Sequence, residues 1–316
     1  MPAVYALGLG LAVLAFLGFL ILQLRKKHLH ILQEISSQKS LYEYSWAHLP
    51  TPSDPNSHLP VHYRLEGDSH KPLVILIHGL GANLNCWRRI FPLLKPHFQV
   101  LAFDLPGFGL TPDPNHYFAK SPDQLSPLIF ELIESLKHKG PVHLIGNSMG
   151  GILSLSFMES YPNHVGKVFL INPALSRKLV RLRLYRWAFL AQPLSKILNR
   201  KMLGYLYSRT LSKPKDLELE VLNHLSRSYL QNPDGLRSFA LYVKMIEEQG
   251  IPEVDYSKCL FLFSGGDKVI TAPHRKRTEK FFPHAHTLFH PSGGHQLQED
   301  EPEWLSEEIK KFILSS

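Results

Sequence analysis

The sequence predicts an α/β fold, in which a mostly parallel central sheet carries helices on both faces and an inserted helical cap. Short apolar runs rich in β-branched residues, such as residues 72–77, alternate along the chain with stretches of helical periodicity, such as residues 121–137. Strands that alternate with helices pack into parallel sheets covered on both faces. A helix-rich, basic stretch at about residues 175–249 interrupts this alternation, which indicates a cap inserted into the core.

The expected elements follow one another from about residue 58. β-like sequence lies around residues 61–65, and the run at 72–77 is continuously apolar, as in a strand buried on both faces. Helical periodicity at 121–137 places its leucines and isoleucines on one stripe. The remaining elements are helices at 83–95 and 149–160 and at the C-terminus, and strands at 100–103, 142–145, 168–171, 260–263 and 287–290.

Composition indicates a globular protein, and we expect neither a metal nor a cofactor. The 316 residues are 44% hydrophobic and 20% charged, which suits one large core with an inserted subdomain. Cys86 and Cys259 are the only cysteines, and both have apolar neighbours, so we expect buried, reduced thiols instead of a disulfide framework. No cysteine or histidine spacing suits a zinc ion.

The N-terminus has the sequence of a membrane anchor. Residues 3–22 contain no charged residue, and twenty residues at ~1.5 Å rise span about 30 Å, the thickness of a bilayer's hydrocarbon core. Basic residues at 25–27 follow closely and favour a single-pass protein with the folded domain on the cytoplasmic side. A cleaved signal peptide is the alternative, but the run lacks a preceding basic region and a small-x-small cleavage site.

These features divide the chain into an anchor, a connector and a core interrupted by a cap. Three prolines between 50 and 55 argue against regular structure there, so we place the start of the folded domain near His58. The predicted segments are the anchor with its basic flank at 1–27, the connector at 28–57, the first core part at 58–174, the helical cap at 175–233 and the second core part at 234–316.

The strongest motif is G-x-S-x-G at residues 146–150, with Ser148 at its centre. It lies directly between a predicted strand and a predicted helix, which is the context this motif requires. A nucleophile on such a sharp turn has a strained backbone, and flanking glycines let neighbouring chain approach without Cβ clashes. Ser148 is therefore the candidate nucleophile, and the helix that follows directs its N-terminus at the site.

A serine nucleophile needs a base and an acid. His295 lies in a glycine-rich loop between a weak strand and the last helix, where it has no evident packing role; His290 is its nearest rival. Asp267 follows the predicted strand at 260–263 and would accept the Nδ1 proton of His295. Asp255 and Asp300 are placed wrongly for this role, and the strand ending at 171 is followed by Asn172 instead of an acid.

Two backbone N–H groups are the candidate oxyanion hole. Met149 directly follows the nucleophile, and Leu80 lies between two glycines at the end of the strand at 72–77, where its loop can pack against Ser148. His78 precedes this loop and is expected to orient it instead of transferring protons.

Taken together, the motifs resemble the α/β-hydrolase superfamily over residues 58–316. The resemblance rests on H-G-L-G at 78–81, D-L-P-G-F-G at 104–109, G-N-S-M-G-G at 146–151, and then Asp267 and His295. With the N-terminal span, the chain is similar to membrane-anchored serine hydrolases of the monoacylglycerol lipase and esterase type. The elbow is also similar to that of carbon–carbon bond hydrolases, which are typically soluble. Epoxide hydrolases and haloalkane dehalogenases of the superfamily use an Asp nucleophile, which Ser148 argues against.

The resemblance implies hydrolysis of a lipid-like carboxylic ester through a Ser148 acyl-enzyme, without a cofactor. Carbon–carbon bond hydrolysis, acyl transfer and a catalytically inactive, membrane-tethered binding protein are the alternatives. Residues 160–215 carry twelve Lys and Arg and no acid, so the cap either contacts an anionic membrane or presents a solvated basic face. No motif suggests a nucleic-acid partner.

Overall fold

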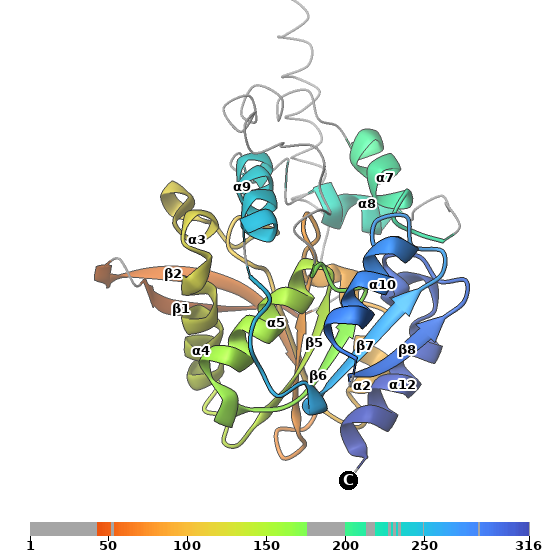
Figure 1. The fold of residues 1–316 in the computed structure, drawn as a ribbon. Helices are drawn as coiled ribbons and strands as arrows, with labels where there is room; N and C mark the ends of the chain where they lie inside the picture. The colour runs from red at the N-terminus through yellow and green to blue at the C-terminus, as the bar shows by residue number, and fades with distance from the viewer. Residues whose placement is uncertain are drawn as a thin grey trace, which may run out of the picture.

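The computed structural model describes residues 43–51, 54–175, 200–212, 219–226, 229, 232, 235–248, 250–283 and 285–315. An eight-stranded sheet with the order β1-β2-β4-β3-β5-β6-β7-β8 forms the centre of these residues (Figure 1). Strands β3 to β8 are parallel, whereas β2 pairs antiparallel with β1 and β4, so the predicted mostly parallel sheet is confirmed. The strands are Ser45–Thr51 (β1), Asp54–Glu66 (β2), Leu73–Ile77 (β3), Gln99–Phe103 (β4), Val142–Asn147 (β5), Val165–Ile171 (β6), Cys259–Ser264 (β7) and His286–His290 (β8).

Helices cover both faces of the sheet. Helices α4 and α5 lie side by side on one face (Figure 1), and their apolar residues share one core cluster. Helices α2 and α12 contribute to a second cluster on the other face. The longer helices are Leu125–Ser135 (α4), Met149–Ser160 (α5), Arg200–Ser208 (α7), Leu219–Ser226 (α8), Gly235–Glu248 (α9), Ala272–Phe281 (α10) and Pro302–Leu314 (α12). The short ones are Leu84–Trp87 (η1), Phe91–Leu94 (α2), Pro114–His116 (η2), Tyr117–Lys120 (α3), Pro122–Gln124 (η3), Pro162–His164 (η4), Tyr256–Lys258 (η7) and Leu297–Asp300 (α11).

Strand β3 illustrates why the continuous apolar runs form central strands. All five of its residues are buried. Successive side chains of a strand point to opposite faces, so Ile75 packs into the first cluster, whereas Val74 and Leu76 pack into the second. A strand with helices on both sides therefore needs an apolar residue at every position.

The sheet starts before residue 58, within the predicted connector at 28–57, and this prediction is corrected. Strand β1 pairs with β2 from Ser45 opposite Tyr63 to Pro50 opposite His58. Strand β1 is the last strand of the sheet on its side, and proline is tolerated on edge strands because one row of N–H groups there needs no partner strand. Pro50, one of the prolines that argued against regular structure, lies on this edge strand.

The helix expected at 83–95 is broken into η1 and α2. Asn83 caps η1 by accepting a hydrogen bond from the Asn85 N–H at 3.0 Å. Pro92 lies in the first turn of α2, where a missing N–H costs no hydrogen bond. Because proline has no N–H to donate to the preceding turn, one helix does not continue from η1 through this position. The apolar residues of both pieces remain buried in the second cluster.

Cys86 and Cys259 are free and buried, as predicted. They belong to the clusters on opposite faces of the sheet. Desolvation by burial raises the pKa of the Cys259 thiol to about 12, and it also raises the pKa of the Cys86 thiol well above its ordinary value. Both thiols therefore stay protonated and unreactive near neutral pH.

Within the predicted cap at 175–233, the structure describes Leu175 and residues 200–212, 219–226, 229 and 232; we call the residues from 200 onward the cap segment. Its helices α7 and α8 lie beyond the carboxyl ends of the parallel strands, as does α9 (Figure 1). The arginine-rich start of the cap and the predicted membrane span at 3–22 fall outside the described residues. In the part of the chain that is described, no helix has both the length and the apolarity to span a bilayer.

Candidate active site

Ser148 forms a strained turn between β5 and α5. Its backbone angles are φ 55° and ψ −114°, in a region that residues with a side chain rarely occupy. A Cβ on Gly146 would lie 2.3 Å from the Gly150 carbonyl oxygen, and one on Gly150 would lie 2.1 Å from the Ile77 carbonyl oxygen. The glycines of the motif are therefore needed because backbone meets backbone on both sides of Ser148.

Asp267 and His295 are brought together from the loops after β7 and β8. The distance from Asp267 Oδ2 to His295 Nδ1 is 2.7 Å, and both residues are buried. The other carboxylate oxygen, Oδ1, accepts hydrogen bonds from the Val269 and Ile270 N–H groups. An ionised carboxylate only accepts, so in a neutral imidazole ring this contact places the proton on Nδ1 and leaves the lone pair on Nε2. This is the tautomer that a general base requires.

Backbone contacts join the two loops that carry this pair. The Gly265 N–H donates to the His290 carbonyl at 2.8 Å, and the Gly266 N–H donates to the Gly293 carbonyl at 2.9 Å. His290, the rival base, has its Nδ1 engaged by the Gly293 N–H at 2.9 Å. It therefore closes the loop before His295.

The elbow and the histidine loop are held together by two asparagines. Asn147 Nδ2 donates to the carbonyls of Ile171 and His295, each at 3.1 Å. Asn172 Nδ2 donates to the same His295 carbonyl at 3.3 Å. Within the described structure, no hydrogen bond joins the Ser148 hydroxyl to His295 itself. The contact runs through the neighbouring residue, and such nucleophile–base bonds are often long before substrate binds.

Sequence reasoning missed the role of both asparagines. In the sequence, Asn172 stands out only because it is not an acid, yet its φ of 45° and its side chain fix the end of β6. Its Oδ1 accepts the Ser264 N–H at 2.9 Å, which ties β6 to β7. The signal in the sequence is an Asn directly after a buried strand, because Asn adopts the left-handed region more readily than most residues.

The two predicted oxyanion donors lie beside the elbow. A Cβ on Gly79 would lie 3.2 Å from Ser148 Cβ, so the loop that carries Leu80 packs directly against the nucleophile. Met149 is the first residue of α5, where an N–H has no partner within the helix. Among the turn and loop hydrogen bonds of the described residues, neither the Leu80 nor the Met149 N–H is a donor.

His78 is buried, and both of its ring nitrogens contact the backbone. Nδ1 lies 2.8 Å from the Gly79 carbonyl, and Nε2 accepts the Leu105 N–H at 3.0 Å. Desolvation by burial lowers the pKa of His78 although the charge of Asp104 opposes this effect. A neutral ring with both nitrogens occupied fits the orienting role expected from the sequence.

Asp104 anchors a buried network next to this loop. It lies 2.7 Å from His62 Nδ1, and it accepts the Leu84 N–H at 2.8 Å and the Leu110 N–H at 2.9 Å. Burial alone would raise the pKa of Asp104, but the hydrogen bond and charge of His62 hold it below its ordinary value. The ionised carboxylate thus holds the segments of His62, Leu84 and Leu110 together.

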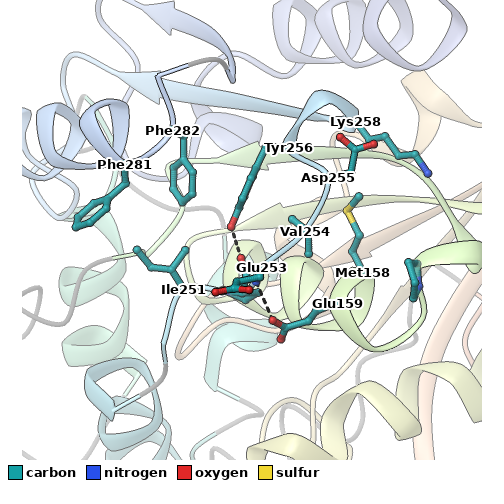
Figure 2. A pocket seen from close by; sticks show the side chains of 12 residues that line it. Met158, Glu159, Ile251, Glu253, Val254, Asp255, Tyr256, Lys258, Phe281 and Phe282 are labelled. Atoms are coloured by element: carbon teal, nitrogen blue, oxygen red, sulfur yellow. Dashed lines mark hydrogen bonds between the residues drawn. The ribbon is translucent and has the colours of Figure 1, made fainter.

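A large open cavity of about 730 Å³ lies away from these residues. Figure 2 shows its lining, which includes Met158 and Glu159 from the end of α5, Tyr256 from the segment before β7, and Phe281 and Phe282 from the end of α10. The end of α5 is opposite to the end that carries Ser148, so this cavity is not part of the candidate site.

The chain belongs to the alpha/beta hydrolase fold family, whose model matches residues 72–302. Among curated relatives, the dihydrolipoyllysine-residue acetyltransferase component of the acetoin cleaving system of Pseudomonas putida is 28% identical over 260 residues, which are 79% of this chain and 65% of that protein. This chain thus matches less than two thirds of that relative's length. The uncharacterized hydrolase YugF of Bacillus subtilis is 24% identical over 263 residues, covering 80% of this chain and 92% of that protein.

Solved structures share the fold. A thermophilic esterase from Thermogutta terrifontis, in its malate-bound structure, aligns with a TM-score of 0.68 over 85% of this chain and 98% of its own, at 16% identity. At such a low sequence identity, the structural similarity shows a shared fold and nothing about the substrate. Family and fold together support a hydrolase.

Proposed function

We propose that the protein is a serine hydrolase that cleaves a carboxylic ester through a Ser148 acyl-enzyme. The observation that carries this proposal is the 2.7 Å contact between Asp267 and His295, held beside the strained Ser148 turn by the hydrogen bond from Asn147 to the His295 carbonyl. An aspartate that fixes the tautomer of a histidine near a serine on a strand-to-helix turn is the arrangement used for acyl transfer.

The chemistry follows from these roles. His295 Nε2 takes the proton of the Ser148 hydroxyl as the oxygen attacks the ester carbonyl. The tetrahedral oxyanion accepts hydrogen bonds from the Leu80 and Met149 N–H groups, which are fixed before the reaction begins. Collapse breaks the bond to the alcohol oxygen, which leaves with the proton from His295. Water, deprotonated by the same base, then releases the acid and restores Ser148.

We infer that the ester is lipid-like. Support comes from the sequence: residues 3–22 suit a bilayer span, residues 25–27 are basic, and the cap carries a local excess of Lys and Arg. A single-pass anchor with the catalytic domain on the cytoplasmic side would hold the site next to its substrate. Membrane contact through the basic cap is part of the same proposal.

The test replaces the nucleophile. We expect Ser148→Ala to lower kcat/KM on medium-chain acyl esters by about 10³-fold or more and to abolish labelling by a fluorophosphonate probe. Ser160→Ala, which removes an exposed hydroxyl at the other end of the same helix, should keep the wild-type kcat/KM and the wild-type labelling. Equal melting temperatures would show that both variants are folded.

Four outcomes would contradict the proposal in different ways. Full activity of Ser148→Ala would reject the nucleophile. A folded wild-type protein that resists the probe would favour the inactive, membrane-tethered binding protein. Product analysis with and without an added alcohol separates ester hydrolysis from acyl transfer, and turnover of a dienone acid in place of esters would favour carbon–carbon bond cleavage.

A further inference from the structure

The cap segment contacts the backbone of the histidine loop directly. The carbonyl of Thr210, just after α7, accepts the His295 N–H at 2.8 Å and lies 3.4 Å from the Gln296 nitrogen. A Cβ on Gly294 would lie 2.4 Å from the Ser212 nitrogen, so no side chain separates the two backbones. The backbone N–H of His295 therefore donates a hydrogen bond to the cap segment. Its backbone carbonyl accepts one from Asn147 of the core.

A single carboxylate oxygen of Asp300 accepts hydrogen bonds from both sides of this contact. Its Oδ2 accepts the Gly294 N–H at 2.9 Å and the Ser212 N–H at 2.9 Å. Gly294 directly precedes His295, and Ser212 belongs to the cap segment, so one half-buried carboxylate joins the two. Hydrogen bonds to an ionised acceptor are roughly twice as strong as neutral ones.

A neighbouring carboxylate strengthens the same contact between the cap segment and the histidine loop. Glu299 Oε1 accepts the Tyr207 hydroxyl of α7 at 3.1 Å and pairs with Arg88 from the core. Tyr207 and Glu299 are both buried. The end of α7 is thus fixed to the segment 294–300 at three places, namely Thr210, Ser212 and Tyr207.

We propose that Asp300 is a positioning residue, which aligns His295 by tying the histidine loop to the cap segment. It is separate from the catalytic acid, because Asp267 occupies His295 Nδ1. The inference rests on the proposed role of His295 as the base. It adds that the placement of the base depends on the cap as well as on the core, so a shift of residues 210–212 shifts the imidazole.

The experiment compares three substitutions of Asp300 in the full chain. Asp300→Ala leaves the Gly294 and Ser212 N–H groups without their acceptor, and we expect kcat on a short acyl ester to fall about 10- to 100-fold with KM within about twofold, since small misplacements of catalytic groups cost rates of this size. The rate of fluorophosphonate labelling should fall in parallel, because a small probe reacts with the triad alone. Glu303→Gln, an exposed acid in the first turn of α12, is the matched control and should keep both rates.

Asp300→Asn and Asp300→Glu decide the matter even when the alanine variant fails to fold. Asn keeps an acceptor oxygen at the same distance from the backbone, so it should retain rates within about threefold to fivefold, whereas Glu keeps the charge but moves the oxygen by one methylene and should lose more. If Asp300 acted only through its charge, Asp300→Glu would instead retain higher rates than Asp300→Asn. Wild-type kcat and labelling in Asp300→Glu, or in folded Asp300→Ala, would overturn the inference and leave the proposed function intact. A wild-type protein that is not labelled would instead refute the proposed function.

Discussion

At the residue scale, single backbone conformations fix the neighbourhood of the nucleophile. Ser148, Asn172 and Gly109 all have positive φ, and each ends or turns a segment next to the candidate site. Gly109 makes the closest approach, because a Cβ there would lie 2.0 Å from Asp104 Oδ2. The carboxylate that organises the surrounding loops thus occupies the space of the missing side chain.

Gly109→Ala should therefore destabilise the protein by more than its backbone angle alone requires. A left-handed conformation costs a residue with a Cβ ~1–2 kcal/mol, and the clash with Asp104 should add about 1–3 kcal/mol in the free energy of unfolding. Gly140→Ala is the matched control, because Gly140 has φ 99° and a Cβ there would meet no heavy atom within 4 Å. Urea unfolding of both variants measures the difference, and equal losses would show that the Asp104 contact has no energetic weight.

At the element scale, the candidate residues come from the carboxyl ends of neighbouring parallel strands. Leu80 follows β3, Ser148 follows β5, Asp267 follows β7 and His295 follows β8. Strands that run in the same direction end at the same edge of a sheet, so residues far apart in sequence meet there. The site therefore depends on β5 and its neighbours keeping their register.

His143 lies near the start of β5, and its titration makes the stability of the folded protein depend on pH. Its Nδ1 accepts the Lys167 N–H of β6 at 3.1 Å. Desolvation by burial, together with the charge of Lys167, lowers the pKa of His143 to about 4. Between about pH 6.5 and 4 the unfolded chain binds a proton that the folded chain does not, so stability falls as the pH falls through this window.

We expect His143→Gln to lose less stability than wild type between pH 7.5 and 4.5, as measured by urea unfolding at both values. The wild-type slope alone is not diagnostic, because burial raises the pKa of Asp113 to about 6 and this group favours the folded state at low pH. The difference between the two proteins removes the Asp113 effect, which they share. Identical slopes would mean that His143 titrates alike in the folded and unfolded chain.

At the scale of the whole molecule, two apolar clusters sandwich the sheet, and the cap segment closes over the edge where the strands end. The contacts of Thr210, Ser212 and Tyr207 with residues 294–300 make the cap part of the site's frame. The proposed bilayer anchor would add a third level of organisation, by holding the domain at a membrane.

We expect the full chain to remain with membranes after an alkaline carbonate wash and to need detergent for release. Twenty uncharged residues at ~1.5 Å rise match the hydrocarbon thickness, and removal of residues 1–27 should release a protein that a fluorophosphonate probe still labels. Ser148→Ala in the full chain is the control, because it changes the site and should leave the partition unchanged. Release of the full chain by carbonate alone would contradict the anchor.

The sequence by itself determined the alternation of strands and helices, the strand-to-helix context of Ser148 and the chain order of the candidate triad. These features are local, because side-chain periodicity and turn chemistry are encoded in windows of a few residues. The same locality explains the errors at β1 and at 83–95, because a short window does not distinguish a proline at a sheet edge or at a helix start from one that breaks regular structure.

Only the tertiary structure decided the strand order, the contact of Asp267 with His295, and the clamps formed by Asn147, Asn172 and Asp300. Asn147 and His295 are 148 positions apart, and Ser212 and Asp300 are 88 apart. No short window contains both partners of such a pair. They meet because the whole sheet closes and the cap packs on it, and this packing depends on the sum of many burial energies instead of on any one motif.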